Sequence, residues 1–504
     1  MNTPRARIAD EVLACLRESG VQPAELCADS RNVRPGDVFV AYPGHRSDGR
    51  RYIPEALRAG AGAVLWEREG FEWNADWIAP NLPVDGLQAL SGHVAHLVYG
   101  RPSERLDLIG VTGTNGKTSV SQWIAQALAR RGCRCGVIGT LGNGFPGDLV
   151  ESPNTTPDAI AMHAHLARFV AGGATSCAME VSSIGLHQER TNGARFAVAV
   201  FTNLTRDHLD YHGTMDAYAA AKARMFDLPG LRASVINLDD AFGRAQALRL
   251  NRRGDRVIGY TLQGGASVAD CSQVLRAVSV ADTGAGLRFE LVTGAESAEV
   301  RAGLIGSFNV SNLLAVIGAL LAADVPLAEA AGLVAHLVPP PGRMQKVGGT
   351  GEPLVVVDYA HSPDALEKVL QALRPTAQVR GGRIICVFGC GGDRDAGKRP
   401  IMGEAARRGA DAVVLTSDNP RGEDPRAILD QVRGGVGPDA TVIVDRADAI
   451  RATVIGADAR DIVVLAGKGH ETYQEIRGTR FPFSDAAHAA SALIDRRSAP
   501  GGRP

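Results

Sequence analysis

The segment Ile109-Gly-Val-Thr-Gly-Thr-Asn-Gly-Lys-Thr-Ser119 decides the fold, because it sets glycines, a lysine and hydroxyls between a strand and a helix. Leu106–Val111 is an apolar run that predicts the strand, and Ser119–Arg131 predicts a helix closed by Gly132. Small residues at such a junction let backbone N–H groups surround phosphate oxygens at the positive end of the helix dipole. We therefore expect a phosphate-binding loop made of Gly113, Thr114, Asn115, Gly116, Lys117, Thr118 and Ser119.

Two residues of this loop have specific expected roles. Lys117 can neutralise the β- and γ-phosphates of a nucleotide, and Thr118 can offer its hydroxyl to Mg²⁺. The spacing is not the strict GxxxxGK[ST] pattern, since Val111 stands where the first glycine would be. The alternative is a glycine-rich turn without function, and the scarcity of lysine argues against it. Only six of the 54 basic residues are lysine, at positions 117, 222, 346, 368, 398 and 468. A lysine inside a motif is therefore a candidate for chemistry that arginine cannot perform.

Apolar runs alternate with helical patterns after this loop. Four further strands are predicted, at Cys135–Leu141, Ser176–Val181, Ala197–Leu204 and Ser234–Leu238. The alternation predicts a parallel sheet with helices on its faces. Residues 255–305 look richer in strand, and Asn309–Ala323 predicts a buried helix. A second α/β series has strands predicted at Leu354–Asp358, Ile384–Phe388, Ala412–Thr416, Thr441–Val444 and Ile462–Ala466.

The clearest linker is Val338-Pro-Pro-Pro-Gly-Arg343, whose composition interrupts helices and strands. Near the N-terminus, a Gly-Arg-Pro break follows a predicted helix at Gly86–Tyr99, and short strands are predicted at Asp37–Tyr42 and Ala63–Leu65. A chain of 504 residues is too long for one hydrophobic core. We expect an α/β fold with three domains, at residues 1–88, 89–338 and 339–504.

The composition excludes several classes of partner. The net charge is −1, so no global field favours nucleic acid or an anionic membrane. Residues 1–20 predict a short amphipathic helix without the apolar core of a secretory signal, and Leu313–Val325 is too short to span a bilayer. Eight scattered cysteines lack a zinc ligand pattern, and we expect buried reduced thiols. A cytoplasmic protein with no nucleic-acid partner and no membrane insertion is expected.

Polar residues follow two of the predicted strands, at the edge where α/β folds bind ligands. Glu180 ends one strand, and its hard oxygen atoms suit Mg²⁺. After another strand, the loop Thr202–Gly213 carries two aspartates and two histidines, Asp207, His208, Asp210 and His212. Taken alone, this loop could equally be a satisfied polar network, and Lys222 could be an ordinary surface lysine. The phosphate loop nearby favours nucleotide and metal chemistry.

These motifs resemble the Mur ligases and their folylpolyglutamate synthetase relatives, which join a carboxylate to an amine at the expense of ATP. GTNGKTS replaces the standard P-loop in those families, and TNLTRDHLDYHG followed by Lys222 is similar to the Mur ligases in detail. The resemblance implies that ATP is a co-substrate and that Lys117, Lys222 and His208 are catalytic. It also implies that Lys222 is carbamylated, so that a negative charge replaces an ammonium beside the metal. Mg²⁺ would then be bound by Thr118, Glu180, His208 and carbamylated Lys222.

Further matches extend the resemblance over nearly the whole chain. Gly306–Asn312 looks like the adenine-contacting segment, with Asn309 as the contact, and motifs that meet phosphate and ribose contain Arg343 and Asp358. The site for UDP-N-acetylmuramoyl-L-alanyl-D-glutamate would comprise Ser30, His45, Asn154, Thr155, Thr156, Ser182, Gln188, Arg190 and Lys222.

The C-terminal motifs match the family members that add meso-diaminopimelate. They are Gly391–Arg394, Asp418–Arg421 and Ala466–Glu471, and each follows a predicted strand. The distal end of meso-diaminopimelate is a zwitterion, for which Arg421 offers a fork and Glu471 an acceptor. Arg394 can hold another carboxylate, and Gly467 permits close backbone approach. The predicted amino-acid site is Arg394, Asp418, Asn419, Pro420, Arg421, Gly467 and Glu471.

The resemblance implies that ATP phosphorylates the D-glutamate side chain and that the diaminopimelate amine attacks the acyl phosphate. The partners would be small molecules, and a monomer is expected. A lysine-adding or a folylpolyglutamate-type ligase is the nearest alternative, opposed by Arg421 and by Asn154–Pro157 respectively. A nucleotide-binding regulator without ligase activity explains residues 106–130 alone, and an inactive paralogue is opposed by the intact motifs. Cys386 and Cys390 have no role in this interpretation, and Lys398 could be either structural or a neighbour of the ligand.

Overall fold

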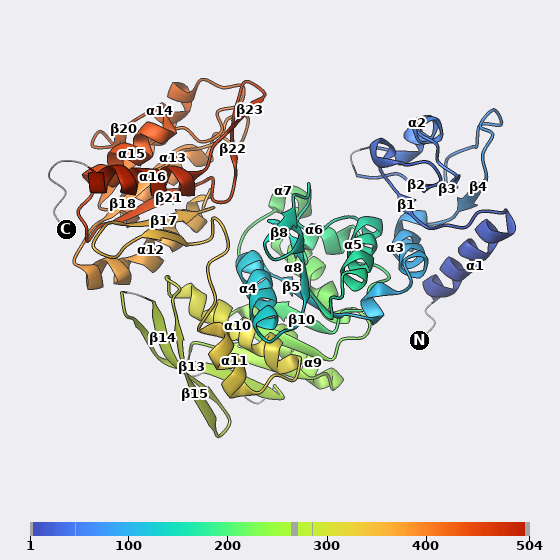
Figure 1. Ribbon diagram of the computed structural model, residues 1–504, viewed down its shortest axis with the longest axis horizontal. Helices are drawn as coiled ribbons and strands as arrows, with labels where there is room; N and C mark the ends of the chain where they lie inside the picture. Colours follow the sequence, from blue (N-terminus) through green and yellow to red (C-terminus); the bar gives the residue numbers. More distant parts are fainter. Residues whose placement is uncertain (1–3, 46, 264–270, 285, 499–504) are drawn as a thin grey trace. The chain divides into compact units, whose positions relative to one another are not determined.

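The computed structural model describes residues 4–45, 47–263, 271–284 and 286–498 (Figure 1). The chain forms two compact units, Met1–Leu275 with Leu314–Ala330, and Arg276–Leu313 with Ala331–Pro504. The predicted α/β class is confirmed, because both units contain parallel sheets with helices. The limits of the three domains stay a prediction. Within the described ranges, a helix with the length and apolarity to cross a membrane is not found.

The N-terminal part of the first unit is a parallel sheet in the order β1-β2-β3-β4. Its strands are β1 (Leu26–Cys27), β2 (Val38–Ala41), β3 (Ala63–Glu67) and β4 (Asn81–Val84). The helices are α1 (Pro4–Glu18), α2 (Ile53–Arg58), α3 (Leu87–Val98) and the 3₁₀ helices η1 (Ser30–Asn32), η2 (Gly49–Tyr52) and η3 (Pro102–Glu104). The predicted amphipathic N-terminal helix is confirmed, since α1 buries Leu13 and Leu16 in a core shared with β2 and β3.

A second sheet of the first unit positions the phosphate loop. Parallel strands run in the order β12-β11-β10-β5-β9-β6, and β7 and β8 continue it antiparallel. The loop follows β5 (Asp107–Thr112), which pairs with β9 (Ser176–Glu180) and β10 (Val198–Phe201). Parallel pairing therefore brings three predicted polar segments to one sheet edge. The other strands are β6 (Cys135–Gly139), β7 (Gly142–Phe145), β8 (Asp148–Val150), β11 (Ala233–Asn237) and β12 (Val257–Thr261).

The helices of the first unit follow the predicted pattern with two corrections. They are α4 (Lys117–Arg130), α5 (Ala159–Ala171), α6 (Ser183–His187), α7 (Leu209–His212), α8 (Met215–Ala223), η4 (Arg224–Asp227) and α9 (Ala241–Arg253). The division between the units falls within α11 (Leu327–Val334). Gly132 follows α4 with a φ of 83°, as predicted for its closing residue. The strand predicted at Cys135–Leu141 is too long, because the chain turns at Thr140 into β7. The predicted loop Thr202–Gly213 contains the helical turn α7.

The second unit contains a sheet in the order β16-β17-β21-β18-β19-β20, in which only β16 is antiparallel to its neighbour. The strands are β16 (Gln345–Gly348), β17 (Leu354–Asp358), β18 (Ile384–Phe388), β19 (Ala412–Leu415), β20 (Thr441–Val442) and β21 (Ile462–Ala466). The last predicted residues of Thr441–Val444 are therefore not strand. The helices are α12 (Pro363–Arg380), α13 (Lys398–Gly409), α14 (Pro425–Val436), α15 (Arg446–Gly456) and α16 (Asp485–Ser498).

The predicted strand-rich region near residues 255–305 is confirmed. After β12 come the antiparallel strands β13 (Gln273–Asp282), β14 (Leu287–Thr293) and β15 (Glu296–Ala302). The predicted buried helix is α10 (Phe308–Ala322), and the division between the units falls within it. A hairpin of β22 (Tyr473–Ile476) and β23 (Thr479–Pro482) was not predicted and follows the third C-terminal motif.

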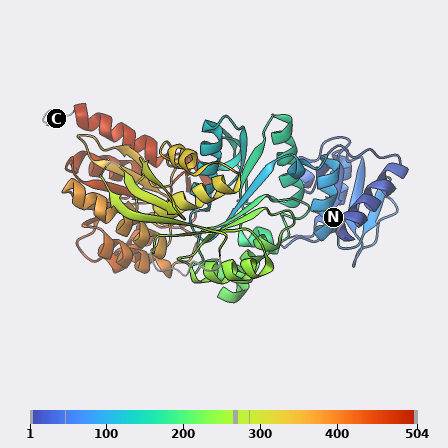
Figure 2. The ribbon, with the colours of Figure 1, turned by 90° about the horizontal axis from the view of Figure 1, so that it is seen from below.

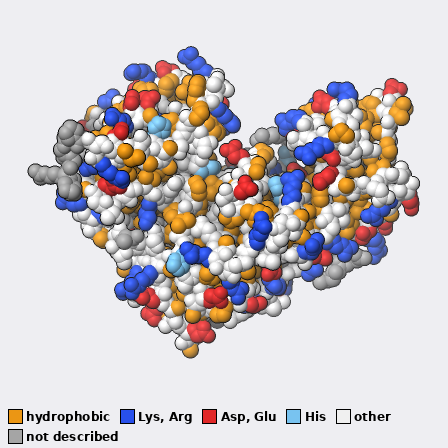
Figure 3. Space-filling view, in the orientation of Figure 1, with side chains coloured by type: hydrophobic (Ala, Val, Ile, Leu, Met, Phe, Trp, Pro, Cys, Tyr) orange, Lys and Arg blue, Asp and Glu red, His pale blue; other side chains and the backbone are white. Residues whose placement is uncertain are grey.

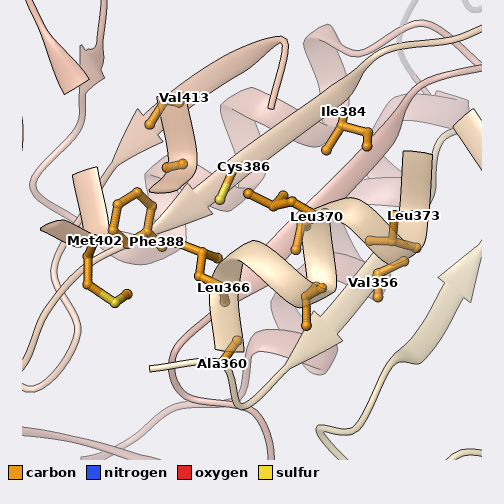
Figure 4. Packing of buried hydrophobic residues seen from close by; sticks show 14 of the residues in the cluster. Val356, Ala360, Leu366, Leu370, Leu373, Ile384, Cys386, Phe388, Met402 and Val413 are labelled. Carbon is orange, nitrogen blue, oxygen red and sulfur yellow. The ribbon is translucent and has the colours of Figure 1, made fainter. Parts of the chain in front are cut away.

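Alternate side chains of the C-terminal sheet point into two separate cores. Val356 of β17 and Phe388 of β18 pack with Leu370 of α12 in one core (Figure 4). Val355 and Val387 point the other way, into a core built with α15 and α16. Figure 2 accordingly shows the red C-terminal helix and the orange helices on opposite sides of this sheet. Burial of each such side chain stabilises the fold by about 1.5–3 kcal/mol.

The composition led to two expectations, a surface without a dominant charge and buried cysteine thiols. Figure 3 shows acidic and basic side chains interspersed on the visible face, in keeping with a net charge of −1. All eight cysteines are free thiols. The expectation that they are buried is wrong for half of them, because they line loops and helix surfaces as well as strands. Cys15 is exposed, and intermediate burial is found for Cys27, Cys133 and Cys271.

Candidate active site

The phosphate loop passes from β5 to α4 through glycines in the left-handed region. Gly113 has a φ of 146°, and a Cβ there would lie 1.9 Å from Oγ1 of Thr202. Gly116 has a φ of 88° and directly precedes α4. Oδ1 of Asn203 accepts a hydrogen bond from the N–H of Asn115 at 2.9 Å. The segment after β10 therefore holds the loop in place, and a side chain at Gly113 is excluded.

Lys117 and Lys222 converge on this loop. Nζ of Lys117 donates to the carbonyl oxygens of Gly113 and Thr114, both at 2.9 Å. Nζ of Lys222 donates to the same Gly113 oxygen at 2.8 Å and lies 4.5 Å from the ring centre of Tyr218. Lys222 is 1% exposed, so the surface-lysine alternative is wrong. Burial, and then the charge of Lys117, lower the pKa of Lys222 well below its ordinary value.

Glu180 ends β9 and is 1% exposed. Its Oε2 accepts hydrogen bonds from the hydroxyls of Thr118 at 3.0 Å and Thr140 at 3.1 Å. Its Oε1 accepts from the N–H of Thr140 at 2.8 Å, and the Thr140 hydroxyl lies 3.1 Å from that of Thr155. A carboxylate beside a phosphate-loop hydroxyl is a hard-oxygen pair of the kind that Mg²⁺ prefers. No group of three His, Cys, Asp or Glu residues in the described ranges could hold a metal ion, whereas Mg²⁺ usually takes one or two carboxylates plus substrate phosphates.

His208 directly precedes α7 and has a φ of 52°. Its Nε2 lies 3.5 Å from Oδ2 of Asp207, and its ring centre is 6.2 Å from that of Tyr218. Tyr218 thus neighbours both His208 and Lys222, and its hydroxyl is 3.0 Å from that of Thr114. Burial lowers the pKa of His208 despite the opposing charge of Asp207, which favours the neutral imidazole that metals require.

Four residues predicted to bind the muramoyl peptide form one hydrogen-bonded group beside α6. Oγ1 of Thr156 accepts from the N–H of Ser182 at 2.9 Å. Arg190 donates to the carbonyl of Thr156 and to Oε1 of Gln188, both at 2.6 Å. The structure therefore brings these four residues together. Asn154 is exposed, in the loop that precedes them.

Tyr211 links this group to the N-terminal part of the chain. Its hydroxyl accepts from Nε2 of Gln188 at 3.1 Å and lies 2.9 Å from Nδ1 of His187. The ring centre of His45 is 5.9 Å from that of Tyr211. Ser30 has a different partner, since its hydroxyl donates to Glu55 at 3.2 Å. Sequence reasoning missed Tyr211, although it stands inside the TNLTRDHLDYHG motif.

In the second unit, the predicted adenine contact is engaged internally. Asn309 is 3% exposed, and its Nδ2 donates to the carbonyl of Ile305 at 2.7 Å. Its Oδ1 accepts from Asn312 at 2.9 Å. Both ends of the Asn309 amide therefore fix the start of α10. A ligand would have to use the second N–H or the second lone pair of this amide.

Asp358 and Arg343 lie close to each other in the same unit. Asp358 accepts hydrogen bonds from the N–H groups of Met344 and Ala360, both at 2.9 Å. Burial raises its pKa, and the charge of Arg343 opposes that shift. The guanidinium of Arg343 lies 4.8 Å from the ring centre of Tyr359. The Nε of Arg343 is buried and has no hydrogen-bond partner among the described residues.

Asn419 and Glu471 both accept hydrogen bonds from Lys468, a residue that sequence reasoning left out of the amino-acid site. Lys468 is fully buried, and its Nζ donates to Oδ1 of Asn419 and Oε2 of Glu471, both at 3.0 Å. Nδ2 of Asn419 also donates to Oε2 of Glu471 at 2.8 Å. Oδ1 of Asp418 lies 3.7 Å from the Lys468 ammonium. The scarcity of lysine in the sequence is the signal that could have found this residue.

Arg421 lies beside this cluster with a φ of 48°. Its Nη1 donates to the carbonyl of Gly392 at 2.8 Å, and its Nε is 3.6 Å from Oε2 of Glu475. Gly467 has a φ of 112°, which accords with the predicted need for glycine there. Arg394 is exposed. The three C-terminal motifs therefore come together, with Asn419 buried, Glu471 half-buried and Arg394 on the surface.

Comparison with known proteins identifies the family. Three family models match, the Mur ligase family, catalytic domain at residues 24–99, the Mur ligase middle domain at 111–320 and the Mur ligase, glutamate ligase domain at 342–469. A Chromobacterium violaceum protein named UDP-N-acetylmuramoyl-L-alanyl-D-glutamate--2,6-diaminopimelate ligase is 50% identical over 484 residues, which cover 95% of this chain and 96% of that protein. The chain belongs to the Mur ligase family.

Other relatives agree with this Mur ligase assignment. A protein of the same name from Ectopseudomonas mendocina is 52% identical over 478 residues, covering 94% of this chain and 96% of its own. A solved structure under that name has a TM-score of 0.68 at 38% identity and covers 94% and 95% of the two chains. Mycobacterium tuberculosis folylpolyglutamate synthase, complexed with ADP and AMPPCP, shares the fold, with a TM-score of 0.60 at 18% identity over 81% of this chain and 95% of its own.

Proposed function

We propose that this Mur ligase uses ATP to join meso-diaminopimelate to UDP-N-acetylmuramoyl-L-alanyl-D-glutamate during peptidoglycan precursor synthesis. The observation that carries the proposal is the hydrogen bond from Asn419 to Glu471, with Arg421 on the same segment as Asn419, in a chain 50% identical to a ligase of that name. A guanidinium fork near a carboxylate suits the zwitterionic distal end of diaminopimelate. L-Lysine has no distal carboxylate and would leave Arg421 without its ligand partner.

The reaction proceeds by phosphoryl transfer and amide formation. The γ-phosphoryl group of ATP passes to the D-glutamate side-chain carboxylate, and ADP leaves. The amine of diaminopimelate attacks this acyl phosphate, and the tetrahedral intermediate collapses to amide and phosphate. Lys117 exchanges its bonds to the loop carbonyls for phosphate oxygens and stabilises their developing charge. Its role is electrostatic, and no side chain acts as nucleophile.

The edge of β9 fits a Mg²⁺ ion, because the buried Glu180 carboxylate already contacts the Thr118 hydroxyl. Thr118, Glu180, His208 and a carbamylated Lys222 would hold the ion. When bound, it supplies positive charge to the β- and γ-phosphates. Carbamylation converts Lys222 from a buried amine into a carboxylate, which suits that neighbourhood.

We also infer a cytoplasmic location and a monomeric enzyme. ATP and UDP-linked sugars are cytoplasmic metabolites, so the proposed reaction belongs there. One chain carries the phosphate loop and the amino-acid motifs, so a second copy is not needed to supply residues.

The test is phosphate release from ATP, Mg²⁺ and the UDP-muramoyl-dipeptide, with meso-diaminopimelate or L-lysine added in parallel. We expect release that depends on diaminopimelate and is little stimulated by lysine. A preference for lysine would keep the ligase chemistry and overturn the amino-acid assignment. A folded, ATP-binding protein that responds to neither amine would instead be a nucleotide-binding regulator.

A further inference from the structure

Lys468 has no part in the reaction proposed above, although it lies at the centre of the amino-acid motifs. We propose that Lys468 is a positioning residue that orients Glu471 toward the distal ammonium of the incoming amino acid and so sets the selectivity for an amine at that end. The proposal rests on the proposed function, because it deepens the account of the same amino-acid site.

The hydrogen bonds show how the orientation is fixed. The Lys468 ammonium and the Asn419 amide both donate to Oε2 of Glu471, at 3.0 and 2.8 Å. Two donors on one oxygen prevent rotation of the carboxylate and leave Oε1 as the atom that faces a ligand. Asn419 is held in turn, because its Oδ1 accepts from Lys468 at 3.0 Å and from the N–H of Glu475 at 2.9 Å.

Charge explains why a cation is needed at this point. The carboxylates of Asp418 and Glu471 both lie beside the Lys468 ammonium, at 3.7 and 3.0 Å. Another buried cation, Arg446, also acts on Asp418, but it is already paired with Asp485 at 2.7 Å. Without Lys468 the two carboxylates would face each other with less compensation, and Glu471 would lose its fixed orientation.

The surroundings explain why this cation is a lysine. Lys468 is fully buried beneath the hairpin β22–β23, with its Nζ 5.7 Å from the ring centre of Tyr473. Gln474 closes the same space by donating to the carbonyl of Asp418 at 2.7 Å. A compact ammonium reaches Asn419 and Glu471 from one point, whereas a planar guanidinium would need more room.

The experiment compares meso-diaminopimelate with 2-aminopimelate, which keeps both carboxylates and lacks the distal amine. In the wild type we expect kcat/KM to favour diaminopimelate by about 10- to 100-fold, the value of one charged hydrogen bond. In Lys468→Met the KM for diaminopimelate should rise by a similar factor, and the preference should shrink to within about threefold. The KM values for ATP and the UDP-muramoyl-dipeptide should stay unchanged.

Two controls separate positioning from folding. Lys368→Met removes an exposed lysine whose partner is Asp364 on the same helix, and it should leave all constants unchanged. Glu471→Gln should abolish the preference as Lys468→Met does, because it removes the oriented carboxylate, and Lys468→Gln replaces Lys468→Met if that variant fails to fold. A preference that persists in either variant would overturn the proposal, even if thermal stability falls. Wild-type enzyme that ignores diaminopimelate would refute the proposed function instead.

Discussion

Lys117 and Lys222 donate to the same atom, the carbonyl oxygen of Gly113, at 2.9 and 2.8 Å. Two ammonium groups on one acceptor repel each other, and burial removes the water that would screen them. Burial, and then the charge of Lys117, lower the pKa of Lys222, which favours its neutral amine. A neutral amine is the form that reacts with carbon dioxide, so the lowered pKa accords with the proposed carbamylation of Lys222.

Lys222→Ala tests the carbamate directly. We expect activity to fall by about 100-fold or more, because a charge next to the reacting phosphates is lost. Added formate, acetate or propionate should restore part of it by placing a carboxylate in the vacated space. Phosphate release with and without these acids is the measurement, and Lys368→Ala is the matched control. Full activity in Lys222→Ala would remove the carbamate from the mechanism.

His163 should make stability depend on pH. Its ring is fully buried, Nε2 donates to the carbonyl of Asn192 at 3.0 Å, and burial lowers its pKa to about 3. Below the unfolded pKa of about 6.5 the unfolded chain binds a proton that the folded chain refuses, so stability is lost as pH falls toward 3. Near pH 5, His163 should lower the free energy of unfolding by about 2 kcal/mol relative to its value above pH 6.5.

Urea unfolding near pH 7.5 and about pH 5 measures this effect. His163→Gln keeps a donor for Asn192 and cannot be protonated, so its stability should vary less between the two conditions than that of the wild type. The same change at the exposed His336 should leave the pH dependence as it is. An equal loss of stability between the two pH values in the wild type and in His163→Gln would show that His163 is not the group responsible.

Asp485→Asn should destabilise the C-terminal unit strongly. Asp485 and Arg446 are both fully buried and share two hydrogen bonds of 2.7 Å. Removing one charge leaves the other buried and uncompensated, which costs about 3–5 kcal/mol. Asp495→Asn on the same helix breaks an exposed pair with Arg451 and should cost under about 1 kcal/mol. Similar urea midpoints for the two variants would show that the buried pair is not stabilising.

The sequence predicts the parts of the site whose chemistry is local. Gly113, Lys117 and Thr118 form a motif between a strand and a helix, and Glu180 stands at a strand end, so parallel pairing alone brings them together. Strand ends were less predictable, as at Thr140, because the turn into β7 depends on tertiary contacts. The short strands of β7, β8 and the β22–β23 hairpin lie in glycine-rich or polar segments without an apolar pattern.

Other residues depend on partners that are distant in the chain. The sequence around Arg446 does not indicate that Asp485 is its partner. The contact between Tyr211 and His45 likewise joins residues more than a hundred positions apart. The sequence alone leaves Lys222 as a possible surface lysine, and its carbamylation is implied only by family resemblance. Asn309 differs from these residues, because its motif predicts a ligand contact, whereas its side chain forms hydrogen bonds with Ile305 and Asn312.

Gly139→Ala tests whether the position of the Glu180 carboxylate determines the Mg²⁺ requirement. Gly139 has no unusual φ, but an added Cβ would lie 2.3 Å from Oε1 of Glu180. The side chain can yield more easily than the backbone, so the fold should survive while the carboxylate moves away from Thr118. The Mg²⁺ concentration for half-maximal phosphate release should rise by about 10- to 100-fold. Gly332→Ala places a methyl group in open space and should change nothing, whereas an unchanged Mg²⁺ requirement in Gly139→Ala would separate Glu180 from the metal.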